Sequence, residues 1–175
     1  PDLISMAKGI TSGYLPLGAV AVGERVAGPL IEKAGEFFHG YTYSGHPTCA
    51  AVAVENLAIL ERERIIEQVR THTAGYFQRA WATLGDHPLV GEARSIGLMG
   101  ALELVPDKPS RRRFENVGSA GELCRDLCLD NGLVMRAVRD SMIVSPPLVI
   151  TDEQIDELID KARRSLDMTQ EALKR

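Results

Sequence analysis

Lys8 is the residue near the start of the chain whose type and setting most favour chemistry. It follows the apolar segment of residues 3–7, which is expected to form a short buried strand, and Gly9 comes directly after it. A lysine at the end of a buried strand is expected to be partly desolvated, which favours the neutral amine that forms Schiff bases with carbonyl compounds. A solvated surface lysine is the ordinary alternative, and Lys8 alone does not decide between the two.

A second candidate is the loop of residues 38–47, which lies before a predicted helix. The loop contains several glycines and the hydroxyl groups of Tyr41 and Thr42, and Pro47 stands where a first helical residue is expected. Exposed amides, a helix dipole and a threonine hydroxyl together suit a phosphate group. An ordinary capped loop is the simpler interpretation of these residues taken alone.

Arg136 is the third candidate, because it is the single charged residue in the apolar segment of residues 133–137. The segment is predicted to be a strand, and a partly buried arginine needs a carboxylate or phosphate partner. A structural Asp or Glu is the more common partner, so Arg136 alone does not identify a binding site.

Other patterns that could carry chemistry have ordinary interpretations. Cys124 and Cys128 are one helical turn apart, but no histidine or second cysteine pair lies near them in the sequence, so they are predicted to be core residues. The four histidines are scattered without metal-ligand spacing. We find no phosphate-binding Walker motif, no dinucleotide fingerprint and no nucleophile elbow. The sequence therefore predicts no metal site.

The composition excludes several classes of partner. The formal net charge is -4, which provides no general polyanion-binding surface, and no apolar run is long enough to span a bilayer. We therefore expect no nucleic acid and no membrane among the partners. Three cysteines without a secretory segment favour a reducing compartment, which predicts a cytoplasmic protein. The chain enters an apolar stretch directly after Pro1 and Asp2, so we expect a segment of a longer protein.

The hydrophobic periodicity predicts an α/β chain. The predicted strands cover residues 3–7, 19–22, 90–95, 98–105, 133–137 and 142–145. The predicted helices cover residues 25–33, 48–63, 64–84 and 118–131, and Thr151 caps a last helix. The helix of residues 48–63 is apolar around most of its circumference and is expected to be buried on several sides. This order predicts an α/β part joined to a smaller α+β lobe, with the boundary inside the second long helix.

Three motifs together resemble those of one enzyme family. Residues 4–20 look like the signature around the cofactor lysine of class III aminotransferases. Residues 39–47 resemble the second signature of that family, and Arg136 followed by residues 145–148 resembles a third. Because the three motifs occur in the expected order, they are far more specific than any of them alone, and the resemblance covers nearly the whole chain.

The resemblance implies a fold type I architecture, of which this chain would hold only a part. Residues 1–75 would be the C-terminal part of the large cofactor-binding domain, and residues 76–175 would be the small C-terminal domain. Lys8 would bind the cofactor pyridoxal 5'-phosphate covalently through its amine. The family's cofactor sites lie at a homodimer interface, so Tyr41 and Thr42 would bind the cofactor phosphate in the site of the other subunit.

The implied activity is that of an omega-transaminase, which moves an amino group from an amine or omega-amino acid to a keto acid such as pyruvate. Arg136 would receive the carboxylate of the acid, and the freed amine of Lys8 would move the substrate proton. The acidic partner of the pyridine nitrogen and the stacking aromatic of the family would lie before residue 1. We therefore expect the isolated chain to be inactive. An aminomutase or decarboxylase of the same class and a non-catalytic fragment remain alternatives.

Overall fold

The structure is a computed structural model that describes residues 1–33 and 35–174. The chain divides into two compact units, an N-terminal unit of Pro1–Arg64 and a C-terminal unit of Ile65–Arg175. The boundary predicted after residue 75 therefore lies inside the C-terminal unit. The reason is that Ile65 and Thr73, which precede that position, are both buried.

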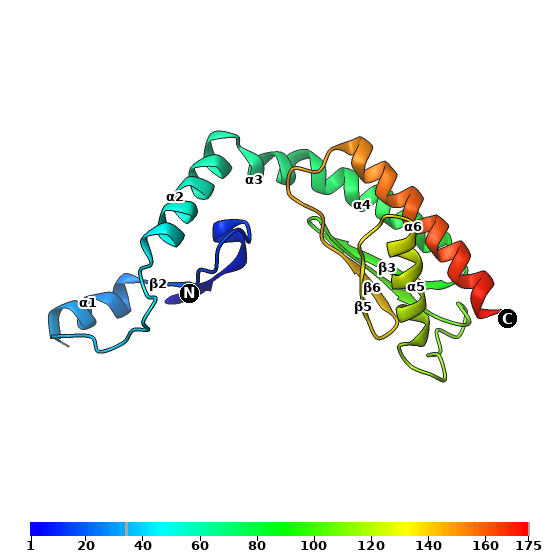
Figure 1. Ribbon diagram of the computed structural model, residues 1–175, viewed down its shortest axis with the longest axis horizontal. Coiled ribbons are helices and arrows are strands. Elements are labelled where there is room, and N and C mark those ends of the chain that lie inside the picture. Colours follow the sequence, from blue (N-terminus) through cyan, green and yellow to red (C-terminus); the bar gives the residue numbers. More distant parts are fainter. Residues whose placement is uncertain (34, 175) are drawn as a thin grey trace. The chain divides into compact units, whose positions relative to one another are not determined.

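The N-terminal unit consists of a strand pair, a short turn of helix and two longer helices (Figure 1). Its elements are β1 (Leu3–Met6), the 3-10 turn η1 (Lys8–Thr11), β2 (Ala19–Val22), α1 (Glu24–Lys33) and α2 (Pro47–Arg62). Strands β1 and β2 pair antiparallel, with Leu3 opposite Val22 and Met6 opposite Ala19. The strands and helices lie close to their predicted positions, but the segment after Lys8, where no helix was predicted, begins with a helical turn.

The N-terminal unit buries little of its own apolar surface. Thr11 and Ala53 are its only buried residues among those the structure describes. Leu3 of β1 is 56% exposed and Val54 of α2 is 69% exposed. The predictions of a buried first strand and of a helix buried on several sides are therefore wrong within this unit, because its two strands and two helices are too few to cover their own apolar faces.

The C-terminal unit is built on a four-stranded antiparallel sheet. Its strands are β3 (Val90–Ile96), β4 (Met99–Leu104), β5 (Arg136–Val138) and β6 (Ser141–Val144), in the order β3-β4-β6-β5. Strand β5 is shorter than predicted and lies at an edge of the sheet. The predicted order of strands and helices along the chain is confirmed.

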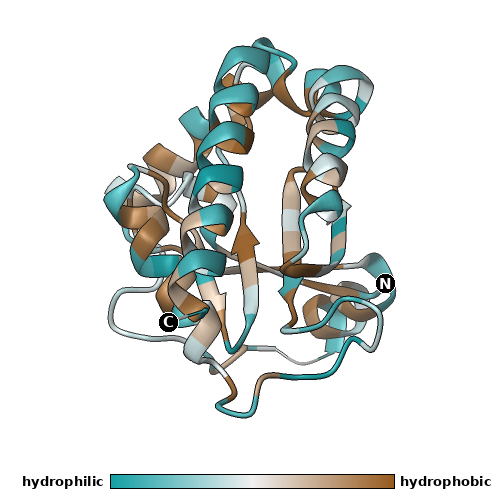
Figure 2. Ribbon diagram, turned by 90° about the vertical axis from the view of Figure 1, so that its right-hand side faces the viewer, coloured by the Kyte–Doolittle hydropathy of each residue, from teal (hydrophilic) through white to brown (hydrophobic). Residues whose placement is uncertain are grey.

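Among the described residues, four helices accompany this sheet, of which the second packs against β3, the third packs against β5 and β6, and the last packs on those two helices. In chain order the four are α3 (Ile65–Gln68), α4 (Ala74–Ala82), α5 (Ser119–Asp130) and α6 (Asp152–Leu173). The predicted long helix of residues 64–84 is present, but a π-helical turn, η2 (Val69–Thr73), interrupts it and a 3-10 turn, η3 (Thr83–Asp86), ends it. In Figure 2 the turns of α6 carry both hydrophilic and hydrophobic residues, as expected for a helix that covers a core on one side.

The core of the C-terminal unit lies between the sheet and its helices. Phe77 and Trp81 of α4 are completely buried, and their rings stack with centroids 5.5 Å apart. Gly100 of β4 provides the space for this pair, because a Cβ atom at that position would lie 2.6 Å from Cε2 of Trp81. Cys124 and Cys128 are also buried in this core, as predicted.

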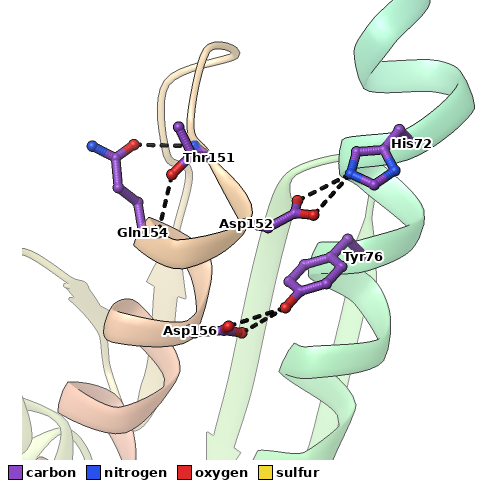
Figure 3. A network of polar contacts seen from close by, with 6 residues as sticks. All are labelled: His72, Tyr76, Thr151, Asp152, Gln154 and Asp156. Atoms are coloured by element: carbon purple, nitrogen blue, oxygen red, sulfur yellow. Dashed lines mark hydrogen bonds and ion pairs between the residues drawn. The ribbon is translucent and has the colours of Figure 1, made fainter.

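Polar contacts join the start of α6 to the helical run that contains the π-turn (Figure 3). His72 Nε2 lies 2.9 Å from Asp152 Oδ2, and the hydroxyl of Tyr76 donates to Asp156 Oδ1 at 2.9 Å. The hydrogen bond to Asp156 raises the pKa of Tyr76 above its usual value. Thr151 caps α6 as predicted, since its hydroxyl accepts from the backbone N–H of Gln154.

Candidate active site

Lys8 lies at the point where β1 ends and η1 begins. Its backbone has a φ of 52°, in the left-handed region that residues with a Cβ rarely adopt, and the strain costs about 1–2 kcal/mol. Its side chain is exposed within the N-terminal unit. The expected partial desolvation is therefore wrong for this unit, because the strand that precedes Lys8 is itself exposed. The strained backbone presents a primary amine at the tip of a strand.

The turn after Lys8 is held from inside by Thr11, which is 1% exposed. The Thr11 hydroxyl donates to the carbonyl oxygen of Leu15 at 2.7 Å and lies 3.4 Å from that of Lys8. The backbone N–H of Gly13, whose φ is 76°, donates to the Lys8 carbonyl at 3.2 Å. These bonds fix the carbonyl side of Lys8 and leave its amine accessible.

Helix α2 holds the same turn from outside through Asn56. The side-chain amide of Asn56 donates to the carbonyl oxygens of Gly9 and Ile10, at 3.0 and 3.2 Å, and accepts from the hydroxyl of Ser12 at 2.6 Å. Sequence reasoning missed Asn56. The only signal was one amide side chain in a largely apolar helical segment, and nothing in the sequence indicates which distant segment it meets.

The loop before α2 presents Tyr41 and Thr42 as exposed residues. The backbone N–H of Tyr41 donates to Ser44 Oγ at 2.9 Å, and the N–H of Ser44 donates to the carbonyl of Tyr41 at 2.9 Å. Helix α2 then starts at Pro47 without a side-chain cap. The loop thus places a threonine hydroxyl close in sequence to an uncapped helix N-terminus, which suits a phosphate group.

Arg136 is the first residue of β5 and lies opposite Ile143 of β6. It is exposed, so the expectation of a partly buried arginine is wrong, because β5 is an edge strand. No carboxylate of the described residues forms an ion pair with its guanidinium. The structural ion pair that was the more common alternative is therefore not formed within the described part of the chain.

The four candidate residues predicted from the sequence belong to different units. Lys8, Tyr41 and Thr42 belong to the N-terminal unit, and Arg136 belongs to the C-terminal unit. Within the N-terminal unit, Asn56 of α2 holds the turn that carries Lys8.

The residues present fit part of pyridoxal phosphate. The cofactor has an aldehyde that reacts with a primary amine and a phosphate that needs amide or hydroxyl donors. The accessible amine of Lys8 is of the kind that the aldehyde requires, and the Thr42 hydroxyl and the N-terminus of α2 are donors of the kind that a phosphate requires. Among residues 1–33 and 35–174, no group of His, Cys, Asp and Glu could hold a metal ion.

The lengths and apolar character of the described helices bear on membrane insertion. None of those described is both long and apolar enough to cross a bilayer.

Comparison with known proteins identifies the class of this chain. The fold matches solved transaminases: a structure described as "Transaminase with L-ala" superposes with a TM-score of 0.92 at 39% identity, over 99% of this chain and 41% of that chain. A PMP-bound aminotransferase from Vibrio fluvialis has a TM-score of 0.89 at 37% identity, over 97% of this chain and 38% of that chain. The fold is therefore that of pyridoxal-phosphate-dependent transaminases.

The family follows from the sequence match. The model of the family described as "Aminotransferase class-III" matches residues 1–166, and the chain belongs to this family, as the motifs predicted. The putrescine–pyruvate aminotransferase of Pseudomonas aeruginosa is 56% identical over 173 residues, which are 99% of this chain and 38% of that protein. The diaminobutyrate–2-oxoglutarate transaminase of Halomonas elongata is 40% identical over all of this chain and 38% of its own length. The chain thus spans about two fifths of the relatives it matches.

Proposed function

We propose that the natural protein containing these residues is a pyridoxal-phosphate-dependent omega-transaminase. It transfers an amino group from an amine or omega-amino acid to a keto acid such as pyruvate. The observation that carries the proposal is Lys8, a primary amine on a strained and exposed turn, inside a sequence that matches the family over residues 1–166. The similarity to a putrescine–pyruvate aminotransferase makes putrescine and pyruvate the first pair to assay.

The proposal assigns roles to Lys8 and Arg136. Pyridoxal phosphate, when bound, withdraws electrons from the substrate carbon that carries the amino group. Lys8 Nζ would hold the cofactor, and its free amine would take the proton from that carbon. Arg136 binds the carboxylate of the acid with two parallel hydrogen bonds, for which a guanidinium is well shaped.

The proposed roles of Tyr41 and Thr42 require that the protein is a homodimer. Tyr41 and Thr42 of one subunit bind the cofactor phosphate in the site of the other. Support comes from the aromatic residues of their loop, since Phe38 is 88% exposed and Tyr43 is 81% exposed, which is unusual for side chains that remain in water. A cytoplasmic location is part of the proposal, and the three free cysteines support it.

The domain assignment is also part of the proposal. The N-terminal unit corresponds to the end of the large cofactor-binding domain, and the C-terminal unit corresponds to the small domain. The poor burial of the first unit supports this, because the end of a larger domain needs the rest of that domain to cover its apolar faces.

The test is an assay of the purified protein at its natural length. Putrescine and pyruvate should yield alanine, and Lys8→Ala should abolish alanine formation together with the visible absorbance of the lysine-bound cofactor. Lys33→Ala, which removes an exposed lysine of the same unit, is the matched control and should retain both.

Product analysis also tests the competing activities. Carbon dioxide release or migration of the amino group within one substrate, without alanine, would replace the proposal with a decarboxylase or an aminomutase. Full turnover in the Lys8→Ala protein would remove Lys8 from the reaction.

A further inference from the structure

Asn56 connects helix α2 to the turn that carries Lys8. Its Nδ2 group donates hydrogen bonds to the carbonyl oxygens of Gly9 and Ile10, at 3.0 and 3.2 Å. Its Oδ1 atom accepts one from the hydroxyl of Ser12 at 2.6 Å. A single amide thus engages three of the four residues that directly follow Lys8.

The turn needs such support because its backbone is strained at both ends. Lys8 and Ser12 have φ angles of 52° and 49°, which are sparsely populated for residues with a Cβ. A four-residue 3-10 turn has poor hydrogen-bond geometry, and the bond from the N–H of Ile10 to Ala7 is 3.4 Å long. Backbone in this state persists only when its surroundings determine it from several directions. The hydroxyl of Thr11 constrains the turn from inside, and the amide of Asn56 constrains it from helix α2.

We propose that Asn56 is a positioning residue for Lys8. It fixes the turn against α2, a regular helix of 16 residues, so that the Lys8 amine stays where it bonds the cofactor and moves the substrate proton. The proposal rests on the role of Lys8 proposed above. It adds that the alignment of the amine depends on an amide 48 positions further along the chain, which holds the backbone of the turn and not the amine itself.

The Nδ2 donor and the Oδ1 acceptor of Asn56 have different partners, which predicts an unusual order in how strongly the Asn56 variants perturb Lys8. In Asn56→Asp the shape is kept, but a carboxylate oxygen replaces the donor and faces two carbonyl oxygens, so the contact becomes repulsive. In Asn56→Ala the side chain is lost, and the two carbonyls, which lie near the surface, can bind water instead. The aspartate variant should therefore perturb Lys8 more than the alanine variant, although aspartate resembles asparagine more closely.

The first measurement is independent of turnover. The cofactor-free protein, at its natural length, is mixed with pyridoxal phosphate and reduced with borohydride at timed intervals. Mass spectrometry then gives the rate at which Lys8 is modified. We expect the rate to fall in the order wild type, Asn56→Ala, Asn56→Asp, with the last at least about tenfold below the wild type, because small displacements of a reacting group lower rates strongly.

A second measurement separates positioning from substrate binding. The kcat for transamination should fall in the same order as the modification rate, while the KM for the amine changes by less than about threefold, since the side chain of Asn56 is engaged with the turn. Ser12→Ala removes only the bond to Oδ1 and should cause a smaller loss. It also provides a variant that disturbs folding less, should the Asn56 variants be poorly stable.

Asn131→Asp is the matched control. Asn131 also donates its side-chain amide to a backbone carbonyl, that of Leu127 at 2.7 Å, but it belongs to the C-terminal unit. The control should lower thermal stability without slowing the modification of Lys8.

The outcomes distinguish the two proposals. If wild-type Lys8 is modified and both Asn56 variants and Ser12→Ala react at the wild-type rate, Asn56 is not a positioning residue and the proposed function is unaffected. An order in which alanine is worse than aspartate would also overturn the inference, since it would indicate a role in packing. If wild-type Lys8 is not modified at all, the proposed function fails, and the inference fails with it.

Discussion

Arg136 shows how a single side chain can be tested for one role. If its guanidinium binds the carboxylate of the keto acid, Arg136→Ala should lower kcat/KM for pyruvate by the equivalent of roughly 1.5–3 kcal/mol, the range for a hydrogen bond to a charged group. Reactions with amines that lack a carboxylate should change far less. Steady-state kinetics with both substrate types check this prediction.

The control for Arg136 comes from the polar loop of the same unit. Arg112 is also exposed, and Arg112→Ala should leave both substrates unaffected. An equal loss for both substrate types in Arg136→Ala would assign Arg136 a structural role instead.

His87 carries a pH dependence that can be worked out from its contacts. Its side chain is only 4% exposed, its Nδ1 accepts from the backbone N–H of Leu89 at 3.1 Å, and its Nε2 lies 3.2 Å from Asp167 Oδ1. Burial lowers the pKa of His87 from its usual value, although the hydrogen bond to Asp167 acts in the opposite direction. The neutral ring is therefore favoured in the folded state.

The sign of the effect on stability follows from this lowered pKa. His87 contributes its full stability above the unfolded pKa of about 6.5, and the contribution is lost as the pH falls through the lower pKa of the folded state. Denaturant unfolding at a series of pH values should show this loss, and His87→Gln should reduce the slope. The exposed His72, changed to Gln, serves for comparison. An unchanged slope in His87→Gln would contradict the prediction.

At the scale of elements, α5 lies so close to the turn between β5 and β6 that only glycine fits. A Cβ atom on Gly121 would overlap the carbonyl oxygen of Arg139, and its N–H donates to the buried Asp140 at 3.2 Å. Gly121→Ala should therefore lower the free energy of unfolding by about 3 kcal/mol, the upper end of the usual range for overpacking that shifts the backbone. Denaturant unfolding measures this.

Gly75→Ala makes the same exchange inside α4. Its nearest neighbour is the flexible end of Arg79, 3.3 Å from the added atom. Because alanine favours the helix over glycine by up to about 1 kcal/mol, this variant should be neutral or more stable. A Gly121→Ala protein as stable as Gly75→Ala would show that α5 can move away from the turn.

The elements also show what the sequence could and could not predict. The strands, the helices and the cap at Thr151 follow from local periodicity and local hydrogen bonding, which the sequence displays directly. The π-turn η2 does not, because the same apolar spacing fits a continuous helix. Asn56 was missed for a related reason, since its partners are Gly9 and Ile10, and contacts of this range have no local signature. The roles of Lys8, Thr42 and Arg136 came from a resemblance and stay predictions.

At the scale of the whole molecule, the two units differ in how much apolar surface they bury. The C-terminal unit has a continuous core, while the N-terminal unit leaves strand and helix faces exposed. Residues 1–175 expressed alone should therefore self-associate through the N-terminal unit, bind pyridoxal phosphate weakly and catalyse no measurable transamination. Sedimentation, a cofactor titration and an assay with putrescine and pyruvate test these expectations.

A second preparation is the control for that experiment. Residues 65–175 should remain monomeric, because this unit has its own core. Stoichiometric cofactor binding with turnover by residues 1–175 would show that the site is complete without further chain, and it would overturn our account of the N-terminal unit.

At position 8 the left-handed backbone favours one residue type for stability, whereas the proposed reaction requires another. Glycine is the residue that adopts a φ of 52° without strain, so Lys8→Gly should give a more stable protein than Lys8→Ala, which keeps the Cβ. A search for stabilising substitutions that ignores chemistry would thus select against the residue that the proposed reaction requires. Replacing Lys8 with glycine would relieve the backbone strain and stabilise the fold, so only selection for the amine retains lysine at this position.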